Sequence, residues 1–239
     1  MRFFKFVQII LWVFYTQQLH AGLEGILQSN KGGLDDYSGF IVYIKEGASL
    51  PKVKKARQLK VMGQVNKQFS PAVQGIQLGE SVDFINYDDI FHNVFSLSPE
   101  NKFDLGIFKD GKQYDENHHV KNENISSKVQ FKKPGKVQVF CNIHEDMMGT
   151  VYVFDHGYFS QVKKNGQFSL PYPSIEKITL VIDGDRINRP IEKVIRLKEG
   201  KRRFKIGFSA IDQKRVPKHL NKNGEKYEGS WSIEEDEFY

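Results

Sequence analysis

Short segments in which apolar and polar residues alternate recur along most of this chain of 239 residues. Side chains of a β-strand point in turn to opposite faces, so this alternation has the period of a strand. Residues 38–44, 136–140 and 150–154 show it clearly, and turn pairs such as Pro134-Gly135 separate the segments. Frequent short strands with turns between them predict an all-β sandwich or barrel.

A second series of strand-like segments follows residue 155. The pair Asn165-Gly166 stands between two of them, which is a strong signal for a β-hairpin. We therefore predict two β-sandwiches in series, a larger one of residues 22–155 and a small one of residues 156–210. The strand segments that continue the second series are 178–184, 193–197 and 203–208.

The C-terminal residues 211–239 are polar and charged. Such composition predicts a flexible tail. The alternative is a segment that docks on a partner through Trp231, Phe238 and Tyr239.

The first 21 residues differ in character from the rest. Arg2 and Lys5 precede an apolar run over residues 6–15, and the small Ala21 closes the segment. That order is typical of a secretory signal peptide, so we expect residues 1–21 to direct export to the periplasm or the extracellular space. An uncleaved membrane anchor is the alternative, although a spanning helix needs about 20 apolar residues. We expect no membrane span in the mature chain.

The net charge of the chain is +6, and removal of the signal peptide lowers it by two, to +4. The basic residues are not interleaved with aromatic residues as in nucleic-acid-binding proteins, so we expect no nucleic-acid partner. The charge can instead steer an acidic partner protein.

Cys141 is the single cysteine of the chain. An exported chain with one cysteine cannot form an internal disulfide, and an unpaired thiol is a liability in an oxidising compartment. We therefore expect this cysteine to be buried, to coordinate a metal, to carry a covalent attachment or to act in catalysis. His144 follows three residues later and Met147 three after that, between two predicted strands. One short loop thus presents a thiolate, an imidazole and a thioether.

These donor types suit copper. Two histidines and one cysteine with a weak axial methionine form a blue-copper site, whereas zinc more often recruits further cysteines or histidines. His92 is the candidate for the second histidine, because it follows a predicted strand after a short acidic turn. The predicted metal ligands are His92, Cys141, His144 and Met147. A cysteine nucleophile with His144 as its base is the other chemical interpretation, but the sequence shows no oxyanion donor.

The remaining histidines carry no recognisable pattern. We interpret them as ordinary surface or hydrogen-bonded residues, and His20 as part of the signal peptide; the others are His118, His119, His156 and His219.

Residues 65–154 resemble a cupredoxin of the plastocyanin and amicyanin kind. The Cys141-x-x-His144-x-x-Met147 loop is similar in length to that of amicyanin, although Ile143 stands where those proteins carry proline. Further similarity to bacterial exported proteins called methylamine-utilisation-like implies a second β domain like the regulatory domain of carboxypeptidases. The other segments that carry the resemblance are Phe69-Ser70-Pro71, residues 79–84, His92-Asn93-Val94-Phe95-Ser96 and Phe103-Asp104-Leu105-Gly106.

The resemblance implies a protein that carries single electrons on one copper ion between redox partners, and not an enzyme. It implies that the imidazole edge of His144 reaches solvent, that His92 lies deeper, and that Asn93 bonds near the sulfur or ties the ligand segments together. A copper carrier with the same ligands and a structural β-protein remain as alternatives.

Met148 is the alternative axial ligand to Met147. The amicyanin-like spacing favours Met147, and Met147 is also in phase with Val151 and Val153, the predicted inward residues of the next strand. We therefore expect Met148 to be exposed beside His144, where it would suit partner docking.

Overall fold

The structure is a computed structural model that describes residues 22–30, 34–52, 59–123, 127–197, 203–209 and 220–225. The predicted signal peptide and the greater part of the predicted tail lie outside the described residues. Within the described ranges the chain is built of strands, with one short 3-10 helix at Gly47–Ser49. No helix in these ranges is long and apolar enough to cross a membrane. The all-β prediction is confirmed.

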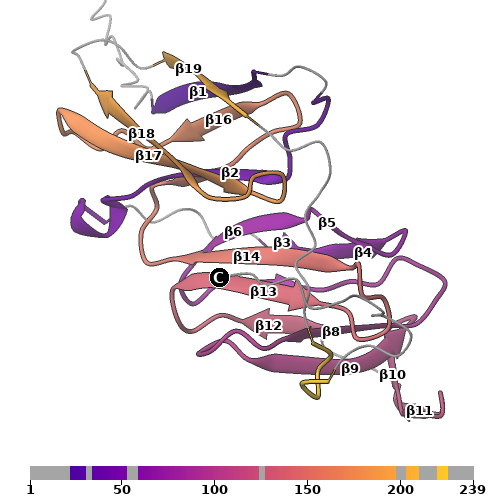
Figure 1. The fold of residues 1–239 in the computed structure, drawn as a ribbon. Coiled ribbons are helices and arrows are strands. Elements are labelled where there is room, and N and C mark those ends of the chain that lie inside the picture. Colours follow the sequence, from indigo (N-terminus) through magenta and orange to yellow (C-terminus); the bar gives the residue numbers. More distant parts are fainter. Residues whose placement is uncertain are drawn as a thin grey trace, which may run out of the picture.

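The first sandwich is built around a seven-stranded sheet in the order β11-β10-β9-β8-β13-β14-β6 (Figure 1). Neighbouring strands are antiparallel except that β6 runs parallel to β14. The bounds of its strands are β6 Val73–Gln77, β8 His92–Ser96, β9 Phe103–Lys109, β10 Lys112–Tyr114, β11 Val120–Asn122, β13 Gly135–Phe140 and β14 Met148–Phe154.

Two smaller sheets complete the first sandwich, one in the order β12-β7-β3 and one formed by the pair β4-β5. Apolar side chains of alternate residues fill the space between them and the large sheet. Val137 and Val139 of β13 and Val151 and Val153 of β14 point into this core, which also contains Cys141. The small-sheet strands are β3 Lys60–Val61, β4 Gly63–Val65, β5 Gln68–Ser70, β7 Ser81–Asp83 and β12 Lys128–Gln130.

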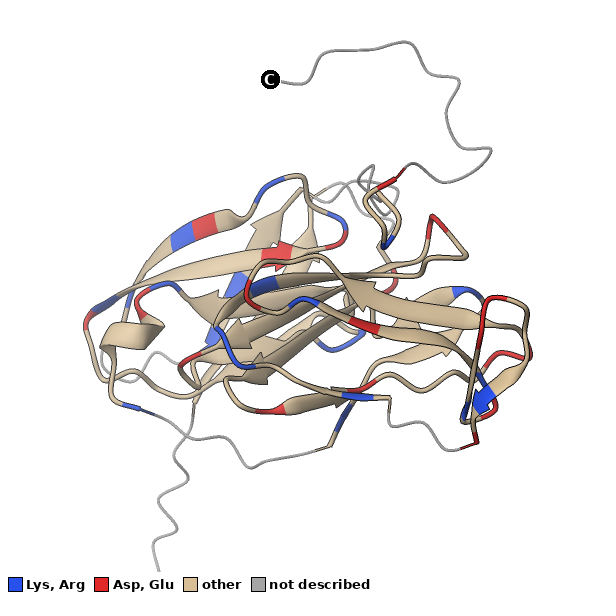
Figure 2. Cartoon of the chain, turned by 90° about the horizontal axis from the view of Figure 1, so that it is seen from below, with Lys and Arg blue, Asp and Glu red and all other residues tan. Residues whose placement is uncertain are grey.

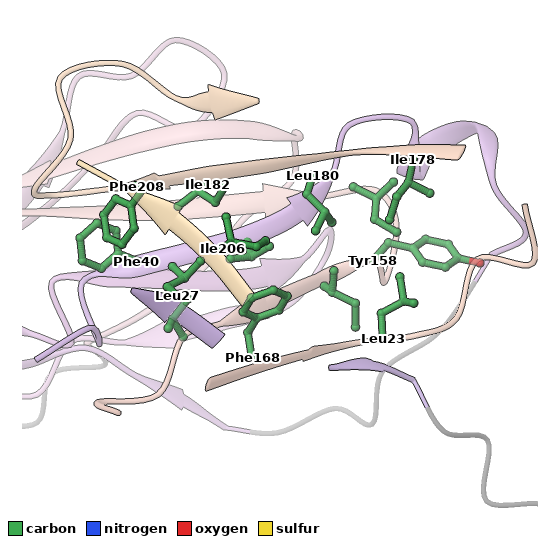
Figure 3. Close-up of a cluster of buried hydrophobic side chains, with 14 of the residues drawn as sticks. Leu23, Leu27, Phe40, Tyr158, Phe168, Ile178, Leu180, Ile182, Ile206 and Phe208 are labelled. Carbon is green, nitrogen blue, oxygen red and sulfur yellow. The ribbon is translucent and has the colours of Figure 1, made fainter. Parts of the chain in front are cut away.

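The second sandwich consists of a sheet in the order β16-β1-β19 and a sheet in the order β15-β2-β17-β18. Aliphatic and aromatic side chains from both sheets form its core (Figure 3). The strands are β1 Leu23–Ser29, β2 Phe40–Ile44, β15 Phe159–Gln161, β16 Gln167–Leu170, β17 Lys177–Gly184, β18 Ile191–Arg196 and β19 Arg203–Phe208.

This strand pairing departs from the predicted boundaries of 22–155 and 156–210. Strands β1 and β2 pair with β16, β19, β15 and β17, and so belong to the second sandwich. The chain begins the second sandwich, leaves it to build the first, and returns. Alternation identified β2, as residues 38–44, but β1 was not predicted, and alternation carries no information about a pairing partner more than 100 residues away in the chain.

The hairpin predicted at Asn165-Gly166 also differs in the structure. The turn is present, with Gly166 at a φ of 84° and its N–H donating to the carbonyl of Lys163 at 2.8 Å. The flanking strands, however, enter different sheets, because β15 pairs with β2 and β16 pairs with β1. The turn therefore connects the two layers of the second sandwich.

The two sandwiches share an apolar interface. Ile41 of β2 and Phe159 of β15 pack there against Val73, Tyr152 and Phe154 of the first sandwich. An ion pair between Lys136 Nζ and Asp183 Oδ2, 3.2 Å apart, borders the contact. Figure 2 shows basic and acidic residues interspersed along the chain, with no face of a single sign in this view.

Candidate metal centre

The candidate ligands come from β8 and from the loop between β13 and β14. His92 is the first residue of β8, and Cys141 follows directly after β13. The loop closes on itself, since Cys141 N donates to Met147 O at 3.1 Å and Met147 N donates to His144 O at 3.0 Å. These bonds hold the cysteine, the histidine and the methionine within one tight turn.

Three of the predicted residues converge on one point. Cys141 Sγ lies 3.8 Å from His92 Nδ1 and 3.6 Å from His144 Nδ1. The two imidazole rings have their centroids 4.9 Å apart. Metal bonds of about 2.3 Å to sulfur and about 2.0 Å to nitrogen, as zinc makes, allow the two donor atoms to lie up to about 4.3 Å apart. The donor atoms therefore fit a single bound metal ion.

The protonation of the three side chains follows from their burial. Burial raises the pKa of the Cys141 thiol, although backbone hydrogen bonds from Asn93, Ile143 and His144 act in the opposite direction. Burial also lowers the pKa of His92 and of His144, which favours the neutral imidazole that binds metals.

The sequence analysis missed Asp88, which orients His92. Asp88 Oδ2 lies 2.8 Å from His92 Nε2, and the carboxylate also accepts the backbone N–H groups of Asn66 at 2.6 Å and of Lys67 at 2.9 Å. Burial acts to raise the pKa of Asp88, but these hydrogen bonds outweigh it and leave the pKa below its ordinary value. An ionised carboxylate only accepts, so Nε2 carries the proton and Nδ1 is free to face Cys141. The available signal was an acidic residue four positions before the histidine.

Asn93 bonds near the sulfur of Cys141, as expected, but through its backbone. Its side chain donates to Asp104 Oδ1 at 2.6 Å and to Gly106 O at 2.9 Å. The side chain therefore ties β8 to β9.

The two methionines pack in different clusters at the start of β14, where Met147 directly precedes the strand and Met148 is its first residue. Met147 is fully buried in the same core cluster as Cys141. Met148 is only 6% exposed and packs against Phe95 and Phe140. The expectation that Met148 is exposed beside His144 is wrong. Met148 begins β14, and every residue of this strand is buried, so both faces of the strand are covered. Ile143, 42% exposed, is the apolar residue at the surface of the loop.

The other described histidines lie outside the site. His118 stacks on Phe91, His119 lies beside Asp115, and His156 accepts the backbone N–H of Tyr158 at 3.1 Å. Within the described ranges, His92, Cys141 and His144 form the one group of metal-binding side chains of this kind. His219 lies outside those ranges.

Comparison with known protein families gives a match over the segment that carries the candidate ligands. The sequence profile of copper-binding proteins of the plastocyanin/azurin family matches residues 57–154. Those residues form a cupredoxin domain, and the domain binds one copper ion. Comparison with curated protein sequences gave no significant match.

The solved structures that match part of this chain include an amicyanin variant, a purple cupredoxin and a pseudoazurin. A reduced amicyanin variant shares 17% identity, with 47% of this chain and 98% of that chain covered and a TM-score of 0.30. A purple cupredoxin from Nitrosopumilus maritimus shares 19% identity, with 41% and 100% covered and a TM-score of 0.29. A pseudoazurin from Sinorhizobium shares 24% identity, with 41% and 74% covered and a TM-score of 0.28.

Proposed function

We propose that this chain is an exported type 1 copper protein that carries single electrons between redox partner proteins. The proposed ligands are His92 Nδ1, Cys141 Sγ, His144 Nδ1 and the axial Met147. The observation that carries the proposal is the convergence of one cysteine sulfur and two imidazole nitrogens, with Met147 buried in the cluster that contains the cysteine.

The donor set favours copper over zinc. The group contains one soft thiolate and two imidazoles, which is the trigonal set of blue-copper sites. A structural zinc site has four strong ligands, and within the described ranges no fourth histidine, cysteine or carboxylate joins the group. The chemistry supplied by a bound copper ion is the reversible exchange of one electron.

The protein itself contributes a rigid framework that holds the candidate ligands in fixed positions. The ladder between β13 and β14, six residue pairs long, holds both ends of the ligand loop. Asp88 fixes the ring of His92, and the two backbone bonds of the loop fix Cys141 and Met147. Ligands held in this way move little when the charge of the metal changes, which lowers the cost of electron transfer.

The burial of the two histidines indicates the route to a partner. His92 is fully buried, whereas His144 is partly exposed and has the exposed Ile143 beside it. The edge of His144 is therefore the proposed point at which an electron enters and leaves. Export rests on the order of residues in the segment 1–21, and N-terminal sequencing of the secreted protein tests it.

A copper carrier with the same ligands is the competing function. Titration of purified protein with copper(II) separates the two functions. A strong visible charge-transfer band that Cys141→Ser abolishes supports electron transfer. Colourless binding of copper(I) alone supports delivery, and absence of copper binding overturns both. The Cys141→Ser variant keeps its β-structure, because buried apolar side chains hold the sandwich together.

A further inference from the structure

The C-terminal residues 220–225, which we call the hook, lie against the first sandwich (Figure 1, yellow segment beside β8 and β9). The last described strand before the hook, β19, belongs to the second sandwich. The chain therefore returns to the metal-binding domain after completing the other one. The hook belongs to the predicted flexible tail, so this part of the tail is in contact with the first sandwich.

The hook touches the ligand loop directly. The backbone N–H of Lys222 donates to Asn142 Oδ1 at 2.9 Å. Asn142 stands between Cys141 and His144, two of the proposed ligands. The hydrogen bond thus holds the first turn of the loop from outside.

The side chain of Lys222 makes a second contact. Its Nζ lies 3.5 Å from Asp104 Oδ2, and the lysine side chain is 23% exposed. The other oxygen of Asp104 accepts Asn93 Nδ2 at 2.6 Å and Gly106 N at 2.8 Å. Asn93 follows His92 in β8. Lys222 is therefore connected to both segments that supply metal ligands.

The hook holds its own shape. Asn221 Oδ1 accepts the backbone N–H groups of Asn223 and Glu225, both at 2.9 Å. Asn221 N donates to Glu225 O at 2.7 Å, and Gly224 lies at a φ of 83°, which glycine adopts without strain. A preformed turn presents the N–H of Lys222 to the loop, so little order has to be created when the contact forms.

We propose that Lys222 is a positioning residue of the copper centre, and that the hook clamps the loop between Cys141 and His144. This inference rests on the proposed function of the site. Restraint of the loop keeps the sulfur and the nitrogen of His144 at a constant separation, and so slows the loss of the metal. The hook places no side chain in either sandwich core, and Leu220 is 45% exposed, so its removal leaves the fold intact.

Two variants remove the two contacts separately. Asn142→Ala removes the acceptor of the Lys222 N–H, and Lys222→Met removes the charge that faces Asp104 while it keeps the length of the side chain. Lys222→Arg retains the charge and is the conservative variant. Lys164→Met is the matched control, because Lys164 is 77% exposed and lies 4.0 Å from Asp36, outside the first sandwich.

The measurements are the visible and electron paramagnetic resonance spectra of the copper(II) protein and the rate of copper loss to a chelator. We expect Asn142→Ala and Lys222→Met to shift the spectra and to speed copper loss by roughly twofold to tenfold, as the loss of one hydrogen bond allows. We expect Lys222→Arg and Lys164→Met to match the unmodified protein. Amide hydrogen exchange in the metal-free protein should quicken over residues 141–147 in the first two variants.

Unchanged spectra, copper loss and exchange in both Asn142→Ala and Lys222→Met would overturn the inference, as would an equal effect of Lys164→Met. If the unmodified protein shows no charge-transfer band, the proposed function fails instead. The exchange measurement still tests the clamp in that case, since it requires no copper.

Discussion

Asp88 provides the sharpest test of how the centre is built. Replacement of Asp88 by alanine leaves the Nε2–H of His92 without its acceptor, and His92 is fully buried. An unsatisfied buried donor costs about 1–3 kcal/mol, so the free energy of unfolding of the metal-free protein should fall by about that amount. The turn at Asn66 and Lys67 also loses its acceptor, which places the expected loss toward the upper end.

The effect on the metal should be separable from the effect on the fold. Loss of the hydrogen-bonding partner of a ligating histidine typically weakens metal binding by roughly 10–100-fold. Asp88→Asn keeps an oxygen acceptor for His92 but removes the charge, so it should weaken copper(II) binding less than Asp88→Ala. Chemical denaturation of the metal-free protein measures stability, and chelator competition measures copper(II) affinity.

The adjacent residue offers a matched control. Asp89 has the same charge, but it is 95% exposed and pairs with Lys109 at 2.6 Å rather than with His92. Asp89→Ala should leave copper(II) affinity nearly unchanged. If Asp88→Ala and Asp89→Ala weaken copper(II) binding equally, the loss of one negative charge near the site explains the effect. The reasoning from the His92 hydrogen bond would then be refuted.

Three further predictions concern the ligands and the boundary of the domain. Met147→Leu should shift the visible spectrum and raise the reduction potential, whereas Met148→Leu should leave both nearly unchanged; spectroscopy and voltammetry of the two variants decide, and the reverse pattern would remove Met147 as the axial ligand. Externally added imidazole should restore the spectrum of His144→Gly more readily than that of His92→Gly, because the first side chain is partly exposed and the second is buried; easier rescue of the buried position would contradict the proposed orientation. A fragment of residues 59–155 should fold and bind copper, because it contains all four proposed ligands; circular dichroism and copper titration test this, and loss of binding would show that the second sandwich is integral to the site.

The sequence by itself determined the all-β class of the fold and indicated the candidate ligands. Alternation of side chains is local, and the pattern over β13 and β14 predicted which residues face the core. The spacing of Cys141, His144 and Met147 is local as well, because one loop carries all three. His92 was identified by residue type and by its position after a strand, and the structure brings its Nδ1 to within 3.8 Å of the sulfur.

Only the tertiary structure decided which segments lie together. Leu23 pairs with Leu170, although the two residues are far apart in the sequence. Lys222, which follows the second sandwich in the sequence, donates its backbone N–H to Asn142 of the first sandwich. Met148 is buried because Phe95, from another strand, covers it. The period of a strand states which side of the chain is apolar, but it does not state which surface will cover that side. Pairing, burial of outer faces and the hydrogen-bonding partners of ligands depend on how distant surfaces pack, and packing is a property of the whole fold.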